Sequence, residues 1–357
     1  MILNRATEKF HGDVGLWRLY LDYTRRQKAH KKTAEVMTKM LRMHPTNPGV
    51  WIYAAKYAAE EKGDMMEARD ALQRGLRFCE RDQDLWIQYG KLEMMFIAKI
   101  AKRRNILGLD QEERLAAQGD DKENGHDDDV VALPVISAEE FEDEDASRPR
   151  AKLSKDFKED TILAGAMPLA VFDAGIKQFN FDAKFGTQFF DMIAEFEGLS
   201  CRLRLLNHIL DTLRSQNSKS SAVLIRYIKL PVLGIKVDNP AFPPGLGQSL
   251  SRLSEVSAHD FPAPTQADVY LQCLECLAQY LTDLSLDDDI RQVIVLTLPK
   301  IWQNFSMVAS DKDLESRERF SSFQARLGEV GLEELSESCR LLAGKIWPDT
   351  GADPKGK

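Results

Sequence analysis

The residues of this chain whose types and spacing could carry chemistry are few and scattered. Cys273-x-x-Cys276 has the spacing of a redox or metal site, but no second cysteine pair or histidine cluster lies nearby. Asp127 to Asp129 would need alternating ligands and a central glycine to form a calcium loop, and it has neither. The six histidines are dispersed, and no phosphate loop, dinucleotide fingerprint, zinc motif or G-x-S-x-G elbow is present. We therefore expect no catalytic residues, no metal, no cofactor and no small-molecule substrate.

Aromatic residues instead recur with a fixed period in the N-terminal part of the chain. Trp17, Trp51 and Trp86 are spaced 34 and 35 residues apart. Other positions keep the same period, namely Tyr20, Ala54 and Tyr89, then Tyr23, Tyr57 and Leu92, and, in a second set, Arg5, Lys39 and Arg74. Two interleaved sets with one period predict a repeated pair of helices.

The segment from residue 47 to residue 80 shows how one such pair is built. Asn47 and Pro48 form a good helix start, since Asn47 can cap and Pro48 needs no donor at the first helical position. Gly63 is expected to end this helix, and Asp64 to begin the next with Glu67 as its capping-box partner. Small residues on the second helix, Ala68, Ala71 and Gly75, let the first helix approach closely. Such pairs must stack to bury their apolar faces, which predicts a solenoid.

This pattern resembles the half-a-tetratricopeptide (HAT) repeat. The residues that carry the resemblance are Trp51-x-x-Ala54-x-x-Tyr57, Glu67-Ala68-Arg69, Arg74-Gly75-Leu76 and Leu85-Trp86-x-x-Tyr89-x-x-x-Glu93. The resemblance implies an all-α, HAT/TPR-like right-handed helical-repeat solenoid, in which the large residues pack between helices. The expected packing residues are Trp17, Tyr20, Trp51, Ala54, Tyr57, Ala68, Gly75, Leu76, Trp86 and Tyr89. A role in stacking on nucleic acid would need exposed rings, which the periodicity argues against.

Among HAT proteins, the chain is most similar to the U3 small nucleolar RNA-associated protein 6 family. The similarity lies in residues 2–17, 27–32, 41–45, 76–79 and 92–109. It implies a non-enzymatic subunit of the small-subunit processome, in the B subcomplex, with β-propeller proteins as partners and an address in the nucleolus of the nucleus. Contact with U3 snoRNA and pre-rRNA would be indirect or weak. Family members begin with a further helical segment, so we expect this chain to lack it.

Composition supports a folded protein with one acidic insertion. The chain has 357 residues, 43% of them hydrophobic, and no apolar run long enough for a membrane span. Its five scattered cysteines fit a reducing compartment. The net charge is −8, but residues 110–160 hold 18 acidic and 7 basic side chains, so the rest of the chain is about +3. Such like-charge clusters cannot offset chain entropy, which predicts a disordered insertion between the two helices of one repeat.

The expected organisation follows from these shifts in pattern. We predict HAT repeats over 1–108, the disordered insertion over 109–160 and degenerate repeats over 161–230, where Gly186 takes a tryptophan position. Residues 231–265, rich in proline and glycine, are expected to be irregular. A C-terminal helical region, with Pro299 expected to kink or break one helix, would span 266–348, followed by a loose tail over 349–357.

Two basic runs leave the mode of interaction open. The first is Arg25, Arg26, Lys28, Lys31 and Lys32, and the second is Lys99, Lys102, Arg103 and Arg104. Polar residues are ordinary at helix ends and corners, but these runs could also contact RNA or a partner. The alternatives to a processome scaffold are therefore a HAT scaffold of pre-mRNA splicing or 3′-end processing, and a direct RNA-binding helical-repeat module.

Overall fold

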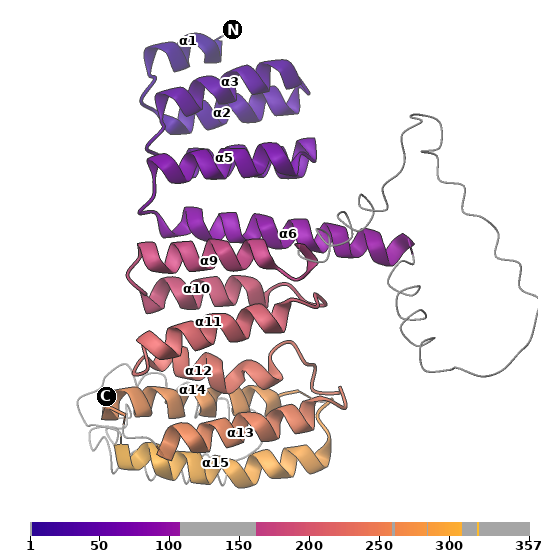
Figure 1. Cartoon of the computed structure of the whole chain (residues 1–357), viewed down its shortest axis with the longest axis vertical. Helices are drawn as coiled ribbons and strands as arrows, with labels where there is room; N and C mark the ends of the chain where they lie inside the picture. Colours follow the sequence, from indigo (N-terminus) through magenta and orange to yellow (C-terminus); the bar gives the residue numbers. More distant parts are fainter. Residues whose placement is uncertain (1, 108–161, 259–260, 284, 309–319, 321–357) are drawn as a thin grey trace, which may run out of the picture. The chain divides into compact units, whose positions relative to one another are not determined.

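The computed structural model describes residues 2–107, 162–258, 261–283, 285–308 and 320 (Figure 1). Every regular element in these ranges is a helix, which confirms the predicted all-α helical-repeat class. The chain divides into two compact units. The first consists of Met1–Gln178 and Gly198–Leu205, and the second of Phe179–Glu197 and Leu206–Lys357. The predicted insertion over 109–160 lies entirely outside the described residues.

The first unit is a stack of antiparallel helix pairs in chain order (Figure 1). Helix α2 packs on α3, α4 on α5, and α6 on α9. The α6–α9 pair joins the two sides of the predicted insertion, so the insertion separates the two helices of one repeat. The helices of this unit are α1 (Ile2–Lys9), α2 (Val14–Arg26), α3 (His30–Met43), α4 (Pro48–Tyr57), α5 (Met65–Phe78), α6 (Gln83–Leu107) and α9 (Ala166–Gln178).

Local capping sets where these helices begin. The Asn47 side chain accepts a hydrogen bond from the Gly49 N–H, and the Asp64 side chain accepts from Met66 and Glu67, as the sequence predicts. The capping box expected at Glu67 is wrong, because its carboxylate binds Lys62 Nζ at 2.7 Å. A π-helical turn, η1 (Ala58–Lys62), extends α4 and brings the Asp64 N–H to the Ala58 carbonyl at 3.0 Å. The backbone therefore supplies the partner that Glu67 would have provided.

The core of this unit is built from the repeating positions. Helices α2, α3 and α4 contribute a cluster that includes Trp17, Leu21, Met40, Val50 and Tyr57, all buried. Because these side chains come from both helices of one pair and the first helix of the next, the apolar surface is continuous across the repeat boundary. This is the arrangement that a stacked repeat requires, since one pair alone cannot cover its own apolar face.

The second unit is also helical. It holds α10 (Ala183–Ala194), α12 (Ser221–Lys229), the 3-10 turn η2 (Leu230–Val232), α13 (Phe242–Ala258), α14 (Ala263–Leu281) and α15 (Asp288–Val308). Helix α11 (Arg202–Gln216) begins in the first unit and ends in the second. The tryptophan position of α10 is Gly186, where an added Cβ would lie 2.3 Å from Leu213 Cδ2. In this degenerate repeat a leucine of the second helix therefore fills the space that tryptophan occupies elsewhere.

The prediction that residues 231–265 are irregular is wrong over Phe242–Ala258, which form α13. Pro243 and Pro244 fall in its first turn, where backbone N–H groups have no partner within the helix, so proline is tolerated there. Gly245 is needed because a Cβ would meet the Pro231 carbonyl oxygen at 2.8 Å. The same residue types that signal a loop therefore start a packed helix.

Two C-terminal expectations have different outcomes. Helix α15 continues through Pro299, so of the two expected effects, a kink or a break, the break does not occur. Most of residues 309–357, including the expected last helices and the tail, lies outside the described residues. Among the described residues, Trp302 stacks on Phe320, with ring centroids 4.4 Å apart.

Candidate functional site

Each of the three periodic tryptophans makes the same backbone hydrogen bond. The indole N–H of Trp17 donates to the His11 carbonyl at 2.9 Å, that of Trp51 to Pro45 at 2.7 Å, and that of Trp86 to Glu80 at 2.9 Å. The acceptor lies six residues before the tryptophan in every case. The indole thus ties the start of a helix to the loop before it, which satisfies its only polar group while the ring packs inside.

The same loop carbonyls also bind a side chain of the next repeat. His44 Nε2 lies 2.8 Å from the His11 carbonyl oxygen, and Cys79 Sγ donates to the Pro45 carbonyl at 3.6 Å. Trp17 and Trp51 are buried, and Trp86 is half-buried. The tryptophans therefore belong to the packing between helices, and the buried rings of Trp17 and Trp51 present no free face to a base.

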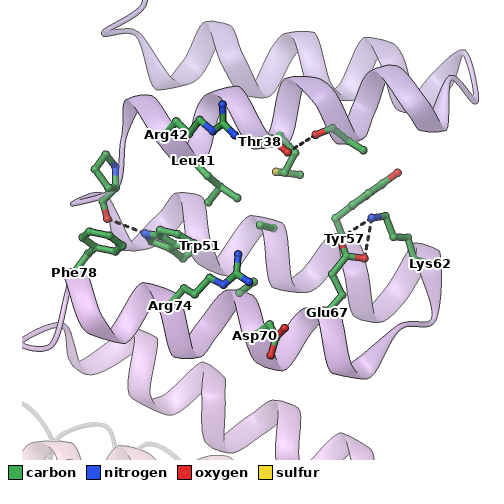
Figure 2. Close-up of a pocket in the computed structure, with 15 residues that line it drawn as sticks. Thr38, Leu41, Arg42, Trp51, Tyr57, Lys62, Glu67, Asp70, Arg74 and Phe78 are labelled. Carbon is green, nitrogen blue, oxygen red and sulfur yellow. Dashed lines mark hydrogen bonds and ion pairs between the residues drawn. The ribbon is translucent and has the colours of Figure 1, made fainter.

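A groove runs along α4 between helices α3 and α5 (Figure 2). Its volume is about 580 Å³, within the range of ligand-binding clefts. Trp51, Ala54 and Tyr57 of α4 form its floor. The walls come from α3, with Ala34, Met37, Thr38, Leu41 and Arg42, and from α5, with Glu67, Asp70, Ala71, Arg74 and Phe78; Pro45 and Lys62 close the ends. We call this the α3–α5 groove.

Aromatic residues dominate one end of the α3–α5 groove. The rings of Trp51 and Phe78 stack with centroids 5.8 Å apart and planes 9° from parallel. Phe78 is 56% exposed, although it is a large apolar residue. Arg42 and Arg74 lie on either side of this ring pair (Figure 2). The groove therefore offers an exposed apolar surface directly beside two guanidinium groups.

The charges of the α3–α5 groove are unevenly paired. Lys62 and Glu67 form an ion pair at 2.7 Å at the far end. Within the described part of the chain, Arg42, Arg74 and Asp70 make no hydrogen bond or ion pair, even though Asp70 and Arg74 are four residues apart on α5. All three are exposed. The Arg42 and Arg74 end therefore carries uncompensated positive charge.

Known proteins that resemble this chain share one name. No protein-family model matches the chain. A fission yeast relative, the U3 small nucleolar RNA-associated protein 6 of Schizosaccharomyces pombe, is 30% identical over 141 residues, which cover 38% of this chain and 29% of the relative. The human homolog of that protein is 30% identical over 103 residues, covering 29% of this chain and 17% of the relative. The chain is thus similar, over part of its length, to proteins of the U3 small nucleolar RNA-associated protein 6 family.

The resemblance predicted from the sequence is thereby confirmed, while the extent of the match is limited. The Dictyostelium discoideum homolog is 22% identical over 202 residues, which cover 55% of this chain and 31% of the relative. The matched regions thus span less than a third of these U3 small nucleolar RNA-associated protein 6 relatives.

The first basic run is spread over a corner between α2 and α3. Arg25 donates to the Tyr53 hydroxyl at 3.0 Å and forms ion pairs with Asp22 and Glu61, and the hydrogen bond with Tyr53 raises the pKa of Arg25. Lys32 pairs with Glu35 at 2.8 Å. Arg26, Lys28 and Lys31 are exposed. Arg25 and Lys32 therefore already have anionic partners within the chain.

The second basic run does not form one face either. Lys102 and Arg103 are exposed, whereas Arg104 is buried. Lys99 Nζ lies 3.4 Å from Met65 Sδ. A continuous basic stripe is what binding along a phosphate backbone would need, and these side chains do not provide one.

The remaining predicted packing residues lie mostly inside. Tyr20, Ala54, Tyr57, Ala68 and Gly75 are buried, and Leu76 is half-buried. Tyr89 is buried, and its hydroxyl accepts a hydrogen bond from Gln73 at 2.9 Å. Burial raises the pKa of Tyr89.

Sequence reasoning missed Arg42 and Phe78 as members of a site, and treated Arg74 only as a repeat marker. The available signal was an exposed aromatic residue at the end of a helix whose pattern is otherwise amphipathic. That signal gains meaning only when the groove between α3 and α5 is known.

Side chains that could bind a metal ion do not gather in the part of the chain that the structure describes. No cluster of three or more His, Cys, Asp or Glu residues with metal-binding geometry occurs in that part. Cys273 lies inside α14, and burial raises the pKa of its thiol to about 12, which disfavours the thiolate that metal binding needs. None of the helices in the described ranges has both the length and the apolar character that a membrane span requires.

Proposed function

We propose that this chain is a non-enzymatic scaffold subunit of the small-subunit processome and the U3 snoRNP. It would support 18S pre-rRNA processing and 40S subunit biogenesis in the nucleolus through protein–protein contacts. The observation that carries the proposal is the similarity to curated relatives named U3 small nucleolar RNA-associated protein 6, from yeast and human. Because the matches span less than a third of those relatives, their role as whole proteins comes to this chain only as part of this proposal.

The geometry favours proteins over RNA as direct partners. A helical-repeat stack presents long grooves that suit extended segments and domain edges. The buried Trp17 and Trp51 rings are not available for stacking on bases, and the Arg25 guanidinium is held by Tyr53, Asp22 and Glu61. Residues 110–160 carry a net charge of −11, which opposes association with phosphate. We therefore propose that RNA contact is weak or indirect.

The proposed partners are the other proteins of the B subcomplex, in particular β-propeller subunits. This part of the proposal rests on the family resemblance. A propeller offers protein edges and flexible extensions, both of which a repeat groove can hold through many modest contacts.

The test is co-purification of the tagged full chain from a nuclear extract, with and without ribonuclease. We expect U3 snoRNA in the untreated sample, detected by northern blotting, and processome proteins in both samples, detected by mass spectrometry. If neither U3 snoRNA nor processome proteins are recovered, the proposal is wrong. If protein recovery collapses after ribonuclease treatment, RNA holds the chain in place and the scaffold mechanism is refuted.

A further inference from the structure

We propose that the α3–α5 groove binds a short segment of a partner protein in which carboxylates lie next to a bulky apolar side chain. The inference rests on the proposed function, because it describes the kind of partner segment that such a scaffold would bind. The occupant is defined by two features of the groove, namely its apolar end and its uncompensated arginines.

The apolar end of the groove is exposed to solvent. Phe78 is more than half exposed, and its ring lies against the buried Trp51 indole. Leu41 and Pro45 line the same groove. A leucine, methionine or phenylalanine of a partner would remove this surface from water while leaving the fold unchanged. Aromatic residues in such positions are typical anchors of protein interfaces.

The two arginines of the groove indicate that the partner segment is negatively charged. Arg42 extends from α3 and Arg74 from α5, on opposite sides of Trp51, and neither has an ion pair or hydrogen bond within the described chain (Figure 2). Two like charges that face one cleft repel each other, and an anion between them relieves this repulsion. Guanidinium groups bind carboxylates in a planar, two-pronged geometry, so acidic side chains would be held in a defined register.

The groove favours an acidic peptide over RNA. Asp70 is exposed and unpaired in the described chain, and it would repel a continuous phosphate backbone along the groove. The floor is made of Ala54 and the buried faces of Trp51 and Tyr57, so neither of these two rings is free for a base, and Phe78 is the exposed ring of the groove. A peptide can place carboxylates only at the Arg42 and Arg74 end and keep them away from Asp70, whereas a nucleic acid cannot.

The first experiment uses a phage-displayed library of random short peptides as the probe. The library is selected on the full chain and counter-selected on the Arg42→Glu/Arg74→Glu double variant. We expect the enriched peptides to share Asp or Glu within a few positions of Leu, Phe, Trp or Met. If no sequence is enriched, or if the enriched sequences lack acidic residues, the inference is overturned.

The second experiment measures one enriched peptide by fluorescence anisotropy. Arg42→Glu/Arg74→Glu should weaken binding by about tenfold or more, because attraction becomes repulsion. Replacing the peptide carboxylates with amides should weaken binding to the unaltered chain by a similar factor. Phe78→Ser should also weaken it, and independently of salt, whereas the arginine effects should shrink as salt rises.

The matched control is Arg77→Glu, which changes an exposed arginine on the same helix outside the groove. It should leave binding unchanged. Because Arg42 and Arg74 are exposed and unpaired in the described chain, their variants should keep the helical circular dichroism signal of the unaltered chain. If Arg77→Glu weakens binding as much as the groove variant, the site is elsewhere.

Two further measurements are needed. The first tells whether the groove binds RNA or peptide, and the second tells this inference apart from the proposed function. Labelled poly(U) should bind the unaltered chain and the double variant alike; binding that depends on Arg42 and Arg74 would refute the peptide and favour nucleic acid. The double variant is also tested for co-purification with U3 snoRNA. Acidic-peptide binding without any U3 co-purification by the unaltered chain would refute the proposed function alone, and U3 co-purification without peptide binding would refute the groove alone.

Discussion

Gly75 lies against Trp51 so closely that a side chain on the glycine would collide with the indole. A Cβ built on Gly75 falls 2.8 Å from both Cβ and Cγ of Trp51. The two residues come from different helices of one repeat, and they face each other because α4 and α5 pack as an antiparallel pair. The large residue of one helix is thus matched to the smallest residue on the other, and this contact sets how near the helices lie.

Gly75→Ala should therefore destabilise the chain. Alanine is a better helix former than glycine by about 1 kcal/mol, but overpacking a tight contact costs about 1–3 kcal/mol. We expect a lower melting midpoint by circular dichroism. The control is Gly247→Ala in α13, where no atom lies within 4 Å of the added Cβ, and this change should leave the midpoint equal or raise it. A rise for Gly75→Ala would contradict the contact.

Trp51→Ala should cost more than Trp86→Ala. Trp51 is 6% exposed and stacks on Phe78, whereas Trp86 is only half-buried. Truncation of a buried tryptophan costs about 3–5 kcal/mol, and in a stack of repeats the damage should reach the neighbouring helices. Denaturant unfolding followed by circular dichroism measures the difference. Equal losses for the two variants would show that the indole–backbone bond, which both tryptophans share, matters more than burial.

Arg69→Met should be strongly destabilising, and a second substitution should rescue it. The Arg69 guanidinium holds the Glu93 carboxylate with bonds of 2.6 and 2.7 Å, and the Glu93 side chain is 1% exposed. Removal of the arginine leaves a buried charge without its main partner, at a cost of about 3–5 kcal/mol. Arg69→Met/Glu93→Leu should recover most of this loss, and a double-mutant cycle of unfolding free energies measures the recovery. Purely additive effects would argue against the pair.

Cys273 should resist alkylation in the folded chain. Burial raises the pKa of its thiol from 9.0 to about 12, so iodoacetamide at pH 8 should label Cys276, which is half-buried on the same helix, before Cys273. The same raised pKa contributes stability that is fully present below pH 9 and is lost as the pH rises toward 12. Peptide mass spectrometry measures the labelling, with a denatured sample as the control in which both residues react. Equal labelling in the folded chain would show that α14 exposes Cys273.

Several features of the fold could be predicted from the sequence because they depend on neighbours along the chain. Asn47 and Asp64 cap helices through their own next residues, and the period of Trp17, Trp51 and Trp86 reports one helix pair after another. The similarity to U3 small nucleolar RNA-associated protein 6 was also evident from the sequence. Proline and glycine misled the prediction over α13, since Pro243 and Pro244 break a helix interior but begin a helix well.

The features that only tertiary structure decided depend on residues far apart in sequence. Arg69 meets Glu93, Trp51 meets Gly75, and Arg42 faces the same groove as Arg74 only because the helices of successive repeats pack at one spacing. Local propensity and periodicity specify which face of a helix is apolar, but they do not specify which polar residues find a partner. The sequence by itself therefore determined the repeat, its class and its resemblance to known proteins, whereas packing across repeats determined that two arginines and Phe78 remain available at the α3–α5 groove.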